Sequence, residues 1–410
     1  MWRIPLSDLN YDEQEQQAVA EVLQSCWLTM GPRTEQFEAA MAAYLGVKHA
    51  IAVANCTCAL ELAYEAAIEA RGGERRRIIV PDITFVATAN AAIAAGGIPE
   101  LLDVEGWDHP MLNRALTESV LDRLDGQTAV LAIVHYAGFD ANSVEFRRLS
   151  NDHGIILIED AAHATGGKTA AGRALGTTGD IGCFSFFSNK NLATGEGGLV
   201  VTNSDDFAAR IRLARSHGMT TLTYDRHRDR RIGYDVVRAG HNYRCTEITA
   251  ALGLVQLAKL DAANARRREL YRLYCDNLKG CDGVRVLYGQ DSEAVGKSAC
   301  HILPLLCRDK ALRDKVREAL TTAGIQSSHH YPALHSFTFY RDYLEKKIGA
   351  SLPEDPEQGS GLPVRAVGSV APGWPNAANF AARQITLPLY PALTNSAVSE
   401  ICDIVILAAG

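Results

Sequence analysis

The sequence predicts an α/β fold in which a mostly parallel β-sheet lies between layers of helices. Short apolar runs alternate with helix-like segments along the first half of the chain, which is typical of a doubly wound sheet. Polar residues that can carry chemistry follow several of these runs, where ligands bind in such sheets. The length of 410 residues and the apolar content of 47% are sufficient for two or three domains with a sizeable core.

The N-terminal part is expected to begin with helices over residues 11–25 and 33–44. The apolar runs that we expect to form strands span residues 50–54, 77–80, 98–104, 129–135, 154–160, 181–187 and 199–201. The helical segments between and after these runs span residues 59–70, 86–95, 144–151 and 207–216. Such an order places helices on both faces of a mostly parallel sheet.

The C-terminal part begins with two expected helices, over residues 248–259 and 261–278. We place the change of domain there, which gives a large domain over residues 1–262 with an N-terminal helical arm and a smaller α+β domain over residues 263–410. Further expected elements are a strand over residues 299–306 and helices over residues 310–323 and 394–407. Residues 351–376 are rich in Pro and Gly without a clear period, so we expect a long loop.

The composition argues against several classes of function. The formal net charge of −7 and a pI near 6.0, without a basic block, argue against nucleic-acid binding. No window has the apolar length of a membrane span, and the N-terminus lacks the regions of a signal peptide. The ten cysteines show neither a disulfide framework nor zinc-ligand spacing, so we expect reduced thiols, no metal and a cytoplasmic location.

The most informative stretch is a Gly-rich polar turn between residues 187 and 199, which carries a single lysine, Lys190. A lysine in a turn is usually solvated. Where a lysine is held in apolar surroundings, desolvation lowers its pKa and frees a neutral amine for Schiff-base chemistry. The other groups at the same edge of the sheet decide between these interpretations.

Three such groups follow other apolar runs. Asp160 ends one run, and Phe85 lies in the loop after another. Residues 55–58 connect a strand to a helix, where backbone and hydroxyl donors suit a phosphate, although for this stretch taken alone plain N-capping by Asn55 or Thr57 is the better explanation. A buried lysine, a strand-end aspartate, a phosphate cradle and a flat aromatic face are what pyridoxal phosphate (PLP) requires.

Further motifs occur in order along nearly the whole chain. They are Gly31-Pro32 with Glu38, Asn55-Cys-Thr-Cys-Ala-Leu60, Pro81-Asp-Ile-Thr-Phe-Val-Ala-Thr88, Glu159-Asp-Ala-Ala-His163, Gly179-Asp-Ile-Gly-Cys-Phe-Ser-Phe-Phe187, Lys190 with Gly195-Glu-Gly-Gly198, His217-Gly218, Gly240-His-Asn-Tyr-Arg244 with Glu247, and Leu387-Pro388. In this order the motifs resemble those of the DegT-type nucleotide-sugar aminotransferases. The resemblance implies PLP fold type I, with a mostly parallel seven-stranded sheet between helices in the large domain, and a homodimer with shared active sites.

The resemblance also implies roles for individual residues. Lys190 would be the catalytic Schiff-base lysine and proton carrier, and Asp160 would pair with the pyridine nitrogen. Thr57, the backbone of Cys58 and Ser185 would hold the phosphate of PLP.

Other cofactor contacts come from more distant parts of the chain. Phe85 would stack on the ring and His163 would lie beside the cofactor oxygen, although either side chain could instead be structural. Asn242 would reach the phosphate of the neighbouring subunit.

The resemblance implies two residues that bind substrate. Arg244 would clamp the carboxylate of the amino donor, for which its planar guanidinium is suited, although it could instead pair with Glu247 at helical spacing. His330 would belong to a C-terminal substrate pair, although His329 offers an alternative register.

The implied activity is amino transfer from glutamate or glutamine to a keto-sugar, carried by a nucleotide diphosphate and bearing its ketone at C4 or C3 of a deoxyhexose. A keto-cyclitol of the scyllo-inosose type is an alternative acceptor, and a non-catalytic sensor or scaffold is an alternative of another class. Sugar dehydration fits less well, because related dehydratases carry histidine where this chain has Lys190. Many relatives have Ser-Gly-Thr where this chain has Asn55-Cys56-Thr57, which leaves the tightness of the phosphate loop open.

Overall fold

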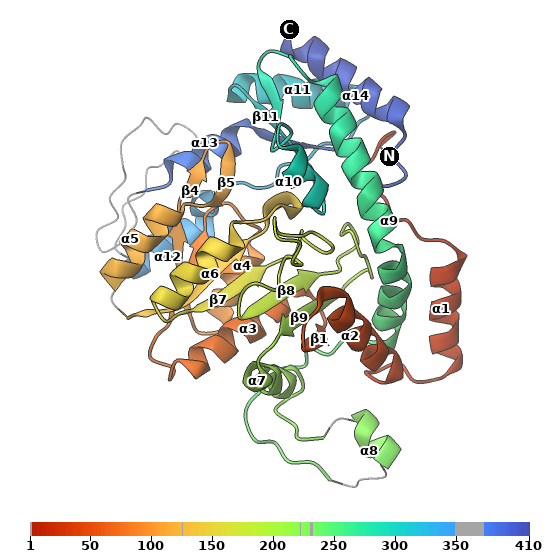
Figure 1. Ribbon diagram of the computed structural model, residues 1–410, viewed down its shortest axis with the longest axis vertical. Helices are drawn as coiled ribbons and strands as arrows, with labels where there is room; N and C mark the ends of the chain where they lie inside the picture. The colour runs from red at the N-terminus through yellow and green to blue at the C-terminus, as the bar shows by residue number, and fades with distance from the viewer. Residues whose placement is uncertain (1, 125, 222, 230–232, 349–372) are drawn as a thin grey trace.

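A seven-stranded sheet forms the centre of the computed structural model, which describes residues 2–124, 126–221, 223–229, 233–348 and 373–410 (Figure 1). Its strands, in the order β1-β9-β8-β7-β6-β2-β3, are β1 (His49–Val53), β9 (Gly198–Thr202), β8 (Ile181–Ser185), β7 (Ile156–Asp160), β6 (Thr128–Val134), β2 (Arg77–Pro81) and β3 (Ile98–Leu102). Strand β9 pairs antiparallel with β1 and β8, and the other pairs are parallel. The predicted mostly parallel seven-stranded sheet is confirmed.

Both faces of this sheet are buried. Along β1, Ile51 and Val53 pack into one hydrophobic cluster, whereas Ala50 and Ala52 pack into a second one. Because successive side chains of a strand point to opposite faces, the two clusters lie on the two sides of the sheet. This double burial explains why the strands are continuous apolar runs in the sequence.

The first part of the chain also contains helices, several of which begin or end at recognisable caps. They are α1 (Glu13–Gln24), α2 (Pro32–Leu45), α3 (Cys56–Ala70), α4 (Ala87–Ala94), α5 (Arg114–Leu124), α6 (Ser143–Asp152), α7 (Asp205–Arg215) and α8 (Thr223–Asp229). Asp12 and Glu15 form a capping box at the start of α1, and Gly46 with a φ of 68° ends α2. A short hairpin, β4 (Val104–Gly106) and β5 (His109–Leu112), is separate from the central sheet. In Figure 1, α8 projects from the body of the molecule.

The C-terminal part is built on α9 (Glu247–Asn277), a continuous helix of 31 residues. Its other elements are β10 (Val284–Val286), α10 (Ser292–Lys297), β11 (Leu303–Cys307), α11 (Lys310–Thr322), α12 (Thr338–Ile348), α13 (Pro375–Arg383), β12 (Gln384–Leu387) and α14 (Asn395–Ala409). Strands β10, β11 and β12 form an antiparallel sheet. Figure 1 shows α1 and α2 beside one half of α9 and α14 beside the other, and α9 contacts all three helices.

Several predicted elements differ in the structure. The two helices expected over residues 248–278 are the single helix α9, because the sequence between them contains no residue that breaks a helix. The predicted domain boundary at residue 262 therefore falls inside α9 and stays a prediction. The segment after Ser216, for which we predicted no helix or strand, contains α8.

The predicted loop over residues 351–376 lies largely outside the described residues. The predicted position of its C-terminal end, residue 376, is wrong. Helix α13 begins at Pro375, and Asp103 accepts hydrogen bonds from the backbone N–H groups of Asn376 (3.1 Å) and Ala377 (2.8 Å). The carboxylate of Asp103 thus accepts backbone N–H groups at the start of this helix that have no partner within the helix. The local sequence does not reveal this distant contact. Among the helices of the described residues, none has both the length and the apolar character needed to cross a bilayer.

Candidate active site

Residues from three segments meet at the edge of the sheet where the parallel strands end. Ser185, the last residue of β8, pairs with Gly198, the first residue of β9. A Cβ atom added to Gly198 would collide with the carbonyl carbon of Asn55, just before α3. The absence of a side chain at Gly198 therefore lets β9 pack directly against the start of α3, which brings Asn55 close to Ser185.

The N-terminus of α3 is a candidate anion site. The side chain of Asn55 caps the helix by accepting the N–H of Cys58 at 2.9 Å, so the substitution of Asn for Ser in this motif keeps the cap. Thr57 is exposed in the first turn. Because Asn55 already occupies the N–H of Cys58, the predicted phosphate contact through that backbone would compete with the cap. The helix dipole and the first-turn donors of α3 remain suited to a phosphate.

Asp160 ends β7 with a nearly buried carboxyl group. Its Oδ2 accepts a hydrogen bond from the Oγ1 of Thr88 at 2.8 Å, and its Oδ1 accepts one from the N–H of Ala162 at 3.1 Å. Burial raises the pKa of Asp160, while these hydrogen bonds and the charge of Lys190 lower it. The carboxyl group is therefore fixed in orientation and its charge is sensitive to a cationic neighbour.

Lys190 lies in the turn after β8, where its N–H donates to the carbonyl of Phe187 at 2.8 Å. Burial lowers the pKa of the Lys190 amine to about 8, while Cys56 and Asp160 raise it. The structure thus brings the lysine within electrostatic reach of Asp160. Part of the amine is therefore neutral near neutral pH, as a nucleophilic lysine requires.

The predicted ring-contact residues lie in one group. The ring of Phe85 is 55% exposed and its centroid is 5.8 Å from that of Tyr331. Tyr331 Oη is 2.8 Å from Nε2 of His163, and Nδ1 of His163 accepts the N–H of Ala137 at 3.3 Å. Burial lowers the pKa of His163 well below its usual value, so the ring is neutral and donates from Nε2 to Tyr331.

His330, rather than His329, lines a small recess beside the lysine, together with His301 and Ser7. Nδ1 of His330 lies 2.9 Å from Oγ1 of Thr386. Burial lowers the pKa of His330 to about 3, so this ring is neutral as well.

Arg244 and Asn242 lie on a segment that runs beside the end of β1. Arg244 forms a β-bridge with Val53, and its buried Nη1 has no hydrogen-bond partner among the described residues. The alternative pairing of Arg244 with Glu247 does not form, because both carboxylate oxygens of Glu247 accept hydrogen bonds at the start of α2. The donors to Glu247 are the N–H groups of Gly31 (2.9 Å), Arg33 (2.8 Å) and Thr34 (2.9 Å) and the hydroxyl of Thr34 (2.7 Å). Asn242 is exposed.

His301, which precedes β11, belongs to the site but was not predicted from the sequence. Its Nε2 lies 3.4 Å from Nζ of Lys190, and its ring centroid lies 4.4 Å from that of His163. His301 belongs to none of the quoted motifs. Its only sequence signal is a histidine next to an apolar run, which is more often structural.

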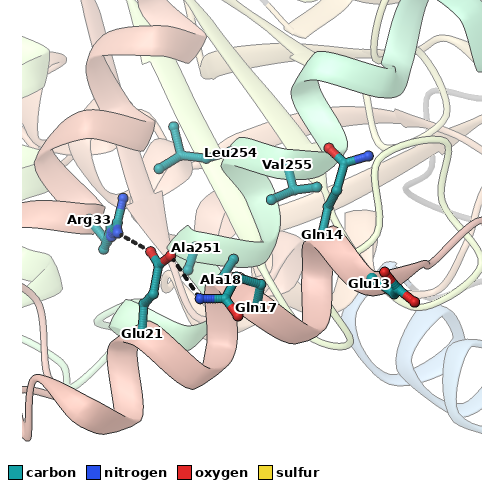
Figure 2. A pocket seen from close by; sticks show the side chains of 9 residues that line it. All are labelled: Glu13, Gln14, Gln17, Ala18, Glu21, Arg33, Ala251, Leu254 and Val255. Carbon is teal, nitrogen blue, oxygen red and sulfur yellow. Dashed lines mark hydrogen bonds and ion pairs between the residues drawn. The ribbon is translucent and has the colours of Figure 1, made fainter.

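A separate cavity of about 420 Å³ lies between α1 and α9. Figure 2 shows Glu21 bonded to Arg33 and to Gln17 at this cavity, with Leu254 and Val255 of α9 behind them. The residues around this cavity include none that line the recess at His301. We therefore place the candidate active site at the strand ends and not in this cavity.

The groups that lie together at the strand ends fit the chemical groups of PLP. The N-terminus of α3 and Ser185 suit a phosphate, the exposed ring of Phe85 offers a stacking face, and the oriented carboxyl of Asp160 suits a protonated ring nitrogen. The amine of Lys190, with a pKa near 8, suits an aldehyde.

Comparison with known proteins agrees with this geometry. The sequence model of the DegT/DnrJ/EryC1/StrS aminotransferase family matches residues 10–355. The spore coat polysaccharide biosynthesis protein SpsC of Bacillus subtilis is 32% identical over 403 residues, which cover 96% of this chain and 94% of that protein.

Two solved structures share the whole fold. PseC of Helicobacter pylori, an aminotransferase involved in the biosynthesis of pseudoaminic acid, has a TM-score of 0.83 and 28% identity, covering 98% of each chain. DesV of S. venezuelae, in complex with a ketimine intermediate, has a TM-score of 0.82 and 30% identity, covering 100% of this chain and 99% of DesV.

Proposed function

Because the chain belongs to the DegT/DnrJ/EryC1/StrS aminotransferase family, we propose that it binds PLP and aminates a keto-sugar. The amino donor is glutamate or glutamine, and the acceptor is a 4-keto or 3-keto deoxyhexose carried by a nucleotide diphosphate. The names of PseC and SpsC connect similar chains with pseudoaminic acid and with a spore coat polysaccharide, which supports a sugar acceptor. The observation that carries the proposal is Lys190, whose amine has a pKa of about 8 and lies within electrostatic reach of Asp160.

When bound, PLP supplies an aldehyde that captures amines and a ring that accepts the electron pair released at the donor carbon. The first turn of α3, with Thr57, and Ser185 would bind the phosphate. Asp160, oriented by Thr88, would keep the ring nitrogen protonated. The exposed ring of Phe85 would stack on one face of the cofactor ring.

Lys190 moves the proton in this proposal. An amine with a pKa near 8 takes a proton from carbon and returns it at neutral pH, because both of its charge states are accessible. His163 and His330 are neutral rings with low pKa values, so they act as hydrogen-bonding groups toward substrate and cofactor and not as cations.

We also propose that a second copy of the chain completes the site through Asn242. His241 lies 3.2 Å from Glu65 and Tyr243 lies 2.9 Å from Glu61, both on α3. Since neighbouring side chains of an extended segment point to opposite sides, Asn242 points away from its own α3. This orientation suits a contact with the phosphate in the partner subunit. Arg244, whose Nη1 has no hydrogen-bond partner in the described part of the chain, suits the carboxylate of the donor. The cytoplasmic location stays a prediction.

The experiment is a panel of keto-sugar nucleotides and keto-cyclitols, each with glutamate or glutamine, read by mass spectrometry for the aminated product. Amination of a sugar nucleotide is the expected result. Amination of the keto-cyclitol alone would mean that the acceptor is a cyclitol and not a sugar nucleotide. If no acceptor is aminated and the chain does not bind PLP, the proposal is contradicted and the non-catalytic alternative is favoured.

A further inference from the structure

His301 takes no part in the roles assigned above, yet it is the side chain next to Lys190. It lies just before β11, is only 4% exposed, and has its Nε2 at 3.4 Å from Nζ of the lysine. The charge states of both partners and the tautomer of the ring decide which of the two atoms donates.

The tautomer follows from a chain of hydrogen bonds that ends at backbone carbonyls, which can only accept. Nδ2 of Asn191 donates to the carbonyl of Ala299 at 2.7 Å, so Oδ1 of Asn191 is the atom that lies 2.8 Å from Nδ1 of His301. Nδ2 of Asn264 donates to the carbonyl of Thr165 at 3.0 Å, which leaves its Oδ1 to accept the second proton of Asn191 at 2.7 Å. Both amide orientations are therefore fixed.

An amide oxygen facing His301 requires a proton on Nδ1 of the ring. A neutral imidazole carries one proton, so Nε2 is then a bare acceptor. The groups that act on the ring are Lys190, His163, Arg267 and His330, and each of them, like burial, disfavours its charged form. Nη1 of Arg267 donates a hydrogen bond to the backbone carbonyl of His301 at 3.1 Å.

We propose that His301 is a positioning residue whose Nε2 accepts a hydrogen bond from Nζ of Lys190 and so keeps the lone pair of the lysine pointing away from the imidazole. Asn191 and Asn264 hold the ring in the tautomer that this requires. The inference rests on the proposed function, in which Lys190 is the reacting amine.

The first test uses the cofactor-free chain with ¹⁵N-labelled histidine. NMR identifies His301 as the ring missing from a His301→Asn or a His301→Gln variant, so one folded variant is sufficient. At pH 7 the expected spectrum shows a neutral ring with a proton on Nδ1 and none on Nε2. A proton on Nε2, in either the other tautomer or the imidazolium, would overturn the inference.

The second test compares the two variants with PLP bound. Asparagine can place its amide nitrogen near the position of Nδ1 and keep the bond to Asn191, but it has no atom at Nε2, whereas the longer glutamine side chain can place an oxygen there. We expect H301N to lower kcat on the order of 10²-fold with little change in KM for the donor, and H301Q to restore part of kcat. His153→Asn, at the end of α6, is the matched control and should change neither value.

Equal losses in H301N and H301Q, a loss confined to KM, or no loss at all would each contradict the positioning role. These outcomes are separable from failure of the proposed function. If Lys190 does not react with PLP at all, the proposed function fails while the tautomer result stands. If Lys190 reacts with PLP but His301 is protonated on Nε2, only this inference fails.

Discussion

Oγ1 of Thr88 lies 2.8 Å from Oδ2 of Asp160, and this hydrogen bond ties the first turn of α4 to the last residue of β7. Thr84 extends the contact, because its Oγ1 lies 2.7 Å from that of Thr88. The loop that carries Phe85 is thus connected to the carboxyl group that we assign to the ring nitrogen.

We expect Thr88→Val to lower the activity of the enzyme without removing any side chain that we propose to contact the cofactor. The carboxyl of Asp160 would lose one of its donors, which raises its pKa further and costs about 1.5–3 kcal/mol for a hydrogen bond to a charged group. The expected result is a loss of roughly 10- to 100-fold in kcat/KM. Thr321→Val, on the exposed face of α11, is the control, and equal activity of both variants would contradict the role of Thr88.

Two substitutions at Asn55 separate capping from phosphate binding. Asn55→Ala removes the cap of α3 and should lower the free energy of unfolding by about 1 kcal/mol. Asn55→Asp keeps the cap but places a negative charge beside the proposed phosphate, so it should unfold like the parent chain and bind PLP on the order of 10- to 100-fold more weakly. Urea unfolding and a PLP titration measure the two effects. Unchanged PLP affinity in N55D would place the phosphate elsewhere.

Glu247 stabilises the start of α2 from 213 residues further along the chain. Its buried carboxylate accepts four hydrogen bonds there, so Glu247→Ala should lower the free energy of unfolding by about 3 kcal/mol. Glu21→Ala removes an exposed ion pair with Arg33 and should cost less than about 1 kcal/mol. Similar thermal unfolding of the two variants would contradict this account.

The buried amine of Lys190 makes the stability of the cofactor-free chain depend on pH. Burial lowers its pKa from 10.5 to about 8, so between these values the unfolded chain binds more protons and stability rises with pH. Lys190→Met removes the buried charge and should stabilise the chain by about 3 kcal/mol at pH 7, an advantage that disappears above pH 10.5.

Lys48→Met, at an exposed lysine beside Asp205, is the control for Lys190→Met. Denaturant unfolding from pH 7 to 11 measures the difference for both variants. A pH-independent effect of K190M would mean that the amine is solvated.

Much of the site follows from local sequence. Asp160 ends one apolar run, Ser185 lies near the end of another, and Asn55 separates a strand from a helix, so periodicity and capping rules place all three near one edge of the sheet. Lys190 lies between two such runs, which is why its turn could be located before the structure was known.

Contacts between distant residues could not be predicted in this way. Helical spacing suggested that Glu247 pairs with Arg244, whereas its partners are at the start of α2. The contact of His301 with Lys190 joins residues 111 positions apart and leaves no periodic signal. Asp103 likewise decides where α13 begins, from 274 residues earlier in the chain.

The most direct test of the account is borohydride reduction of the chain with PLP, followed by peptide mass spectrometry. We expect a phosphopyridoxyl group on the peptide that contains Lys190, and no such label and no turnover in Lys190→Ala. A label on another lysine, or normal amino transfer by K190A, would contradict the account.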